Sequence, residues 1–169
     1  MPELRITLAR ARRDELPAVQ RLAGVIWRAH YPGIITHDQI DYMLERGYAL
    51  PVLEGFLEGE DRGLELATVD GELAGFAAWY VPDDQSQAKL DKLYVLQSRQ
   101  RLGVGGRLIA HVAELARAAG ARTLVLNVNK YNVQAIRAYE KHGFAIREAV
   151  VVDIGGGYVM DDFVMAAPL

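Results

Sequence analysis

The sequence predicts a single-domain α/β protein built on a mixed β-sheet. Apolar–polar alternation typical of strands occurs both before and after segments with helical spacing. The predicted order is one strand, two helices, three strands, a helix, a strand, a helix and two strands. No repeat, low-complexity tract or linker interrupts the 169 residues, a length typical of one domain.

The first predicted strand covers residues 4–9, which alternate apolar and polar side chains. Asp14 is a candidate N-cap, and Pro17 is tolerated near a helix start. Apolar residues then repeat at helical spacing as far as Trp27, and the YPG sequence at 31–33 ends this helix.

A second helix is predicted after Thr36, because Thr36 and Gln39 form a capping-box signature. Its apolar positions run through Leu44. Residues 51–57 fit either a short helix or an irregular turn.

Two strands, at 64–69 and 72–81, are joined by Asp70-Gly71, a strong hairpin signal. A loop with the sequence PDDQSQ follows. The next strand is predicted at 89–96 and leads into a glycine-rich turn.

The rest of the chain continues this alternation. A helix spans 108–119 and ends at Gly120, and the buried-looking strand TLVLNV occupies 123–128. A second helix runs over 132–142. A terminal hairpin, with strands at 149–154 and 158–165, turns at three consecutive glycines.

Composition narrows the range of partners. The net charge of −3 argues against nucleic acid or an anionic membrane as the main partner, since both favour a basic surface. The absence of cysteine excludes disulfides, thiolate metal sites and a cysteine nucleophile. The four histidines do not cluster, so no metal site is predicted. No signal-peptide core or membrane-spanning run is present, which predicts a cytoplasmic protein.

The glycine-rich turn QRLGVGGRL has the character of an anion site. Its glycines allow close backbone approach, the following helix offers free N–H groups, and three arginines add positive charge: Arg99, Arg101 and Arg107. A triphosphate loop would need lysine and then serine or threonine after Gly106. A dinucleotide loop would need a small residue where Leu108 stands. The glycines alone leave open a turn with no ligand.

Two segments together resemble the GNAT family of N-acetyltransferases. QRLGVGGRL is similar to the family's Q/R-x-x-G-x-G/A segment, and LNVNKYNVQAIRAYEKHGF is similar to its N-x-x-A-x-x-x-Y-x-x-x-G-F segment. They occur in the family's order, and the resemblance covers about residues 72–165. It implies a single domain over 1–169 with a splayed central sheet, helices on both faces and a C-terminal β-hairpin. It also implies an acetyl-CoA-dependent N-acetyltransferase.

The resemblance implies a set of acetyl-CoA contacts. The pantetheine arm would meet the backbone of Leu93 and Val95, with the Val95 N–H as an oxyanion donor. Asn127, Asn132 and Ala135 would line the other side. The segment implied to bind the pyrophosphate comprises Gln100, Arg101, Leu102, Gly103, Val104, Gly105 and Gly106.

Tyr139 falls where the family places its general acid, which protonates the departing thiolate; the alternative is a half-buried structural tyrosine. Related sequences often carry glutamate where this chain has Lys89. Asp91 is the candidate general base, directly or through a water. The alternative is that Asp91 pairs on the surface with Lys89 or Lys92.

The acceptor is expected to be a small-molecule amine such as a polyamine, because aromatic and acidic residues occur together in the acceptor segments. A protein or peptide amine, or a non-catalytic coenzyme A-binding module, are the alternatives. Trp27 can equally be core and His30 a hydrogen-bonded structural histidine. The hairpin could also mediate homodimerisation, which nothing in the sequence shows. The candidate acceptor contacts are Trp27, His30, Tyr31 and Tyr158.

Overall fold

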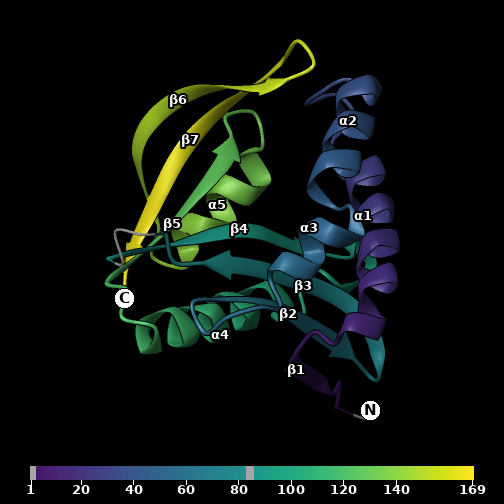
Figure 1. The fold of residues 1–169 in the computed structure, drawn as a ribbon, viewed down its shortest axis with the longest axis vertical. Helices are drawn as coiled ribbons and strands as arrows, with labels where there is room; N and C mark the ends of the chain where they lie inside the picture. The colour runs from purple at the N-terminus through teal and green to yellow at the C-terminus, as the bar shows by residue number, and fades with distance from the viewer. Residues whose placement is uncertain (1–2, 83–85) are drawn as a thin grey trace.

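The computed structural model describes residues 3–82 and 86–169, which form one seven-stranded sheet with helices on both faces (Figure 1). The strand order is β1-β2-β3-β4-β5-β7-β6, and only the β4–β5 pair is parallel. The mixed sheet and C-terminal hairpin predicted from the sequence are confirmed. The elements are β1 (Ile6–Arg10), α1 (Leu16–His30), α2 (His37–Gly47), α3 (Leu50–Gly55), β2 (Arg62–Val69), β3 (Glu72–Tyr80), β4 (Gln87–Val95), α4 (Val104–Ala118), β5 (Thr123–Asn129), α5 (Val133–Lys141), β6 (Ala145–Gly155) and β7 (Tyr158–Pro168).

Some predicted boundaries need correction. Asp14 does not cap α1: Arg13–Glu15 forms a 3₁₀ turn, and the Asp14 carboxylate pairs with Arg12 at 3.3 Å. Residues 51–57, left open by the sequence, begin within the short helix α3. Both hairpin strands are longer than predicted. The predicted PDDQSQ loop lies partly outside the described residues.

The sheet separates two apolar cores. On one face, α1, α2 and α3 bury the alternate side chains Leu64, Leu66 and Phe76. On the other face, α4 covers the intervening residues, including Ala77 and Trp79. Because successive strand residues point to opposite faces and both faces are covered, most residues of β2 and β3 are buried.

The C-terminal hairpin is attached to α2. Thr36 accepts a hydrogen bond from the Gln39 backbone at 3.2 Å, as predicted for a cap. The Gln39 side chain, however, donates to the Val159 carbonyl at 3.0 Å instead of returning to the cap. The Tyr42 hydroxyl donates to the Ile154 carbonyl at 2.7 Å. These two bonds hold the hairpin end over the helices.

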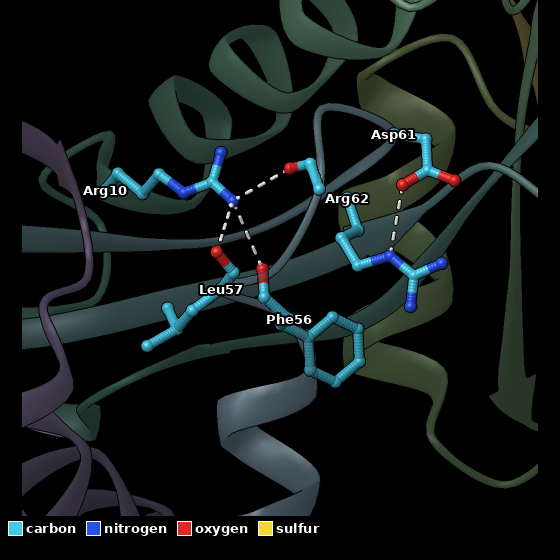
Figure 2. A network of polar contacts seen from close by, with 6 residues as sticks. Arg10, Phe56, Leu57, Asp61 and Arg62 are labelled. Atoms are coloured by element: carbon cyan, nitrogen blue, oxygen red, sulfur yellow. Dashed lines mark hydrogen bonds and ion pairs between the residues drawn. The ribbon is translucent and has the colours of Figure 1, made fainter.

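A separate polar network fixes the connection between α3 and β2 (Figure 2). The Arg10 guanidinium donates to the carbonyls of Phe56, Leu57 and Gly59 at 3.4, 3.3 and 3.2 Å. Arg62 pairs beside it with Asp61 at 3.1 Å. None of these residues lines the cavity described next, so their role is to close the loop onto β1.

The sheet opens between β4 and β5. Their parallel pairing covers only residues 87–89 and 123–125, although β4 continues to Val95 and β5 to Asn129. The strands therefore diverge over most of their length. This confirms the splayed central sheet implied by the family resemblance.

Candidate functional site

A cavity of about 930 Å³ occupies the opening between β4 and β5. Helix α1, both diverging strands, the start of α4, one face of α5 and the hairpin contribute to its lining. Two predicted contacts are not among the lining residues. Leu102 is exposed, and the Tyr158 ring packs on Tyr42 with centroids 5.0 Å apart. The predicted residues that do line it are Trp27, His30, Tyr31, Asp91, Leu93, Val95, Gln100, Arg101, Gly103, Val104, Gly105, Gly106, Asn127, Asn132, Ala135 and Tyr139.

The start of α4 faces the cavity as an uncapped helix end. Gly103 is the N-cap residue, with φ +85°, a left-handed conformation that favours glycine. Within the described chain no side chain caps the helix, and its first intrahelical bond runs from the Arg107 N–H to the Gly103 carbonyl at 3.1 Å. The backbone N–H groups that precede Arg107 in α4 can therefore donate to an anion. The helix dipole also favours negative charge there.

The next two glycines have different surroundings. Among the described residues, a Cβ at Gly105 would meet only the Val95 side chain, at 3.8 Å. A Cβ at Gly106 would lie 2.7 Å from the His142 ring. Alanine at Gly106 would therefore require the His142 ring to shift, whereas packing alone does not explain Gly105.

Positive charge around this end comes partly from residues that the sequence reasoning missed. Arg101 lines the cavity as expected. Arg99 instead pairs with Glu72 at 3.4 Å, and Arg107 donates to a β1 carbonyl at 3.4 Å. Arg137 and Lys141 of α5 replace them. Their spacing of four places both on one helix face, a signal already present in the sequence.

Two glutamines connect the turn to its neighbours. The Gln100 side-chain amide donates to the Val95 carbonyl at 3.3 Å. The Gln134 amide donates in turn to the Gln100 side-chain oxygen at 3.1 Å. The turn is thus fixed to β4 on one side and to α5 on the other.

Tyr139 lies on the α5 face that lines the cavity, next to Phe144 at a centroid distance of 5.6 Å. Burial raises the pKa of Tyr139, and the nearby Tyr31 raises it further. The phenol therefore stays protonated across the neutral range, as a proton donor must.

A group of aromatic side chains lines the α1 side of the cavity. The Tyr31 and Tyr94 hydroxyls are 2.9 Å apart, and the Trp27 ring contacts both tyrosines. Burial raises the pKa of Tyr31 to about 12. Tyr94 and Tyr48 also line the cavity but were not picked out from the sequence, because an isolated aromatic residue in a strand or after a helix is more often ordinary core.

His30 lines the cavity and is also hydrogen-bonded within the protein. Its Nε2 lies 3.0 Å from the Asn132 side-chain oxygen, which also caps α5 by accepting from the Ala135 N–H at 3.4 Å. His30 and Asn132 therefore join α1 to the start of α5 across the cavity.

Four charged side chains line the cavity from β4 and β7. Asp91 pairs with Lys92 at 2.9 Å, and the Lys92 ammonium also lies 4.8 Å from the Tyr48 ring centroid. Burial lowers the pKa of Lys89, which donates to the Asn127 side-chain oxygen. The fourth charge, Asp162 of β7, was not singled out from the sequence, although strand alternation turns one residue of its Asp-Asp pair inward.

Residues 3–82 and 86–169 were searched for a metal site and for a membrane-spanning helix. No group of three or more His, Asp or Glu side chains there is arranged to hold a metal ion. Within the same ranges, no helix is long and apolar enough to cross a membrane.

Known proteins are similar to this chain in sequence and fold. Residues 25–144 match the model of the acetyltransferase (GNAT) family. Streptothricin acetyltransferase of Streptomyces lavendulae is 37% identical over 91 residues, which are 52% of this chain but only 48% of that protein. An uncharacterized N-acetyltransferase of Mycobacterium tuberculosis is 28% identical over 156 residues, 92% of this chain and 97% of its own. The PaiA N-acetyltransferase of Thermoplasma acidophilum, solved with coenzyme A, has the same fold: the TM-score is 0.83 at 21% identity, with 98% and 99% of the two chains covered.

Proposed function

The chain belongs to the acetyltransferase (GNAT) family and is an acetyl-CoA-dependent N-acetyltransferase, and we propose that its acceptor is the primary amine of a small molecule such as a polyamine. One observation carries the proposal. A single cavity joins the uncapped start of α4 to Tyr139 and then to an acceptor side enclosed by α1, α2 and the hairpin.

The residues at one end of the cavity suit coenzyme A. The free N–H groups of α4 and the side chains of Arg101, Arg137 and Lys141 provide donors and positive charge for phosphate groups. The unpaired edge of β4 provides backbone groups at Leu93 and Val95 for a thin, amide-containing arm. Acetyl-CoA supplies the acetyl group as a thioester, whose C–S bond is exchanged for a C–N bond to the acceptor.

The remaining chemistry belongs to this chain's own groups. The Val95 N–H is the proposed donor to the carbonyl oxygen as negative charge develops on it. Tyr139 holds a proton for the departing sulfur and is the proposed general acid. Trp27, Tyr31 and Tyr94 exclude water from the reacting atoms.

Three observations favour a small acceptor. The α2–hairpin contacts from Gln39 and Tyr42 enclose the acceptor side, whereas a peptide would need an extended groove. Two carboxylates line the cavity there, which suits a positively charged amine. One relative is named for streptothricin and not for a protein.

A thiol-release assay with acetyl-CoA tests the proposal. The acceptor panel comprises spermidine, lysine, kanamycin, streptothricin and a set of peptides with free N-termini. We expect turnover with at least one small amine, and turnover with peptides alone would overturn the small-molecule acceptor. Tyr139→Phe should lower kcat about 100-fold and leave the affinity for acetyl-CoA unchanged. If the wild-type protein binds coenzyme A but releases no thiol with any acceptor, the result supports a non-catalytic coenzyme A-binding module instead of an enzyme.

A further inference from the structure

We propose that Asp162 on β7 is the residue that binds the ammonium group of the acceptor and removes its proton before acetyl transfer. This inference rests on the proposed function and assigns the acceptor subsite within it. Asp162 lines the cavity and interacts electrostatically with Lys89 and Tyr31, although it belongs to the C-terminal hairpin.

Asp162 is a buried carboxyl group that lacks a full set of partners. Only 4% of its surface is exposed, and among the described residues its Oδ1 has no hydrogen-bond partner. No Lys, Arg or His of the described chain forms an ion pair with it. Burying a charge without a counter-ion is costly, so the site favours a cation that arrives from outside the chain.

The surrounding charges have other partners. The Lys89 ammonium donates to the Asn127 side-chain oxygen, and the Asn127 side chain hydrogen-bonds to Asp162. Asn127 therefore links Lys89 to Asp162, and these two charged groups form no direct ion pair in the described chain. Asp91, the base predicted from the sequence, already has its counter-ion in Lys92 at 2.9 Å. Of the two carboxylates that line the cavity, Asp162 is thus the one without a direct cationic partner in the described chain.

The protonation behaviour of Asp162 suits a proton acceptor. Burial raises its pKa above the ordinary aspartate value, whereas the Asn127 hydrogen bond and the positive charges of Lys89 and Lys130 oppose the increase and Asp161 adds to it. A carboxylate with a raised pKa is a stronger base than an exposed aspartate. Tyr31 interacts electrostatically with Asp162, and the raised pKa of Tyr31 keeps the phenol neutral.

The proposed step is a simple proton transfer. One N–H bond of the ammonium breaks, an O–H bond forms on Asp162, and the nitrogen keeps the electron pair with which it attacks the acetyl carbonyl. The acceptor class is therefore an amine that is protonated in solution. A neutral aromatic amine carries no positive charge, so this carboxylate would not increase its binding affinity.

The test uses the coenzyme A-loaded protein and isothermal titration with spermidine, lysine, kanamycin and streptothricin. Asp162→Asn should weaken binding of the amine that the wild type binds best by about 30-fold or more. Asp162→Ser is a second neutral variant in case one of the two does not fold. Asp161→Asn is the matched control. The Asp161 carboxylate is adjacent in sequence to Asp162, but it does not line the cavity and pairs with Lys130 at 2.7 Å. This control should change affinity by about threefold at most.

The pH dependence of kcat/KM provides the second measurement. In the wild type, kcat/KM should fall as the pH drops through the raised pKa of Asp162. Asp162→Asn should lower kcat/KM about 100-fold and remove this acidic limb. Asp91→Asn should keep the limb, and a limb lost in Asp91→Asn but kept in Asp162→Asn would overturn the proposal.

The outcomes separate this inference from the proposed function. Unchanged amine binding in both neutral Asp162 variants, or no binding of any of the four amines to the wild type, overturns the assignment of Asp162. An amine that binds through Asp162 but yields no acetylated product supports the subsite and refutes the small-amine reaction. Acetylation that is unaffected by the Asp162 variants leaves the reaction standing and removes Asp162 from it.

Discussion

Replacing Gly105 by alanine distinguishes a glycine needed for a ligand from one needed for the fold. Within the described chain, the new Cβ would meet only the Val95 side chain, at 3.8 Å, which is ordinary van der Waals contact. Gly105 lies in the first turn of α4, where alanine also reduces the conformational freedom of the unfolded chain. The fold should therefore gain about 0.4–1 kcal/mol.

Coenzyme A binding should respond in the opposite direction. The added methyl group would stand among the N–H groups at the start of α4 and keep a phosphate from their surface. We expect a loss of about tenfold or more in affinity, or about 1.4 kcal/mol. Thermal unfolding should show a melting temperature higher by about 1–4 °C without ligand, and isothermal titration should show the weaker binding.

Gly24→Ala is the matched control. Gly24 also lies within a helix, α1, and it does not line the cavity. No described atom outside its own helix turn lies within 4 Å of the position that a Cβ would take there. This variant should gain similar stability and keep wild-type affinity. Wild-type coenzyme A affinity in Gly105→Ala would refute the assignment of the α4 start as the phosphate site.

Three further predictions concern other parts of the molecule. Burial raises the folded-state pKa of Asp162 above its unfolded value, so its contribution to stability is most favourable at low pH and is lost as the pH rises from about 4 through the folded pKa. Asp162→Asn should therefore increase the melting temperature more at pH 7 than at pH 4, and an equal increase at both would contradict this reasoning. Gly63→Ala should lower the free energy of unfolding in urea by about 1–3 kcal/mol, because its Cβ would lie 2.6 Å from two buried side chains; unchanged stability would show that these side chains move freely. Arg137→Gln combined with Lys141→Gln should weaken coenzyme A binding and reduce its salt dependence in titrations at about 50 and about 300 mM salt, because salt screens the attraction between these cations and the phosphates. An unchanged salt dependence would place the phosphates elsewhere.

Most elements of the fold could be predicted because a local signal marks them. Thr36 begins α2, Asp70-Gly71 forms the hairpin turn with positive φ at both residues, and Gly120 follows α4 in the left-handed conformation. The β6 strand was predicted too short, because register shifts near Glu148 and Asp153 interrupt its alternation. A bulge depends on the partner strand and leaves no clear local pattern.

The end of the cavity that is proposed to bind coenzyme A could be identified from the sequence for the same reason. Glycine spacing and a helix start are contiguous features, and the Gly103 conformation follows from them. The binding partners of Arg99 and Arg107 could not be predicted, because Glu72 and a β1 carbonyl contact these arginines from elements that are distant in the sequence. Asp162 was missed because its burial depends on how the hairpin packs against β5.

The two ends of the cavity are encoded in different ways along the chain. The proposed donor side comes from one continuous stretch, residues 93–142, whereas the proposed acceptor side combines residues 26–48 and 89–92 with residues 152–162 of the hairpin. Under the proposed function, substitutions in the hairpin should alter which amine is accepted without disturbing the coenzyme site. The same proposal implies that an evolving lineage can acquire new acceptors while it inherits the donor unchanged.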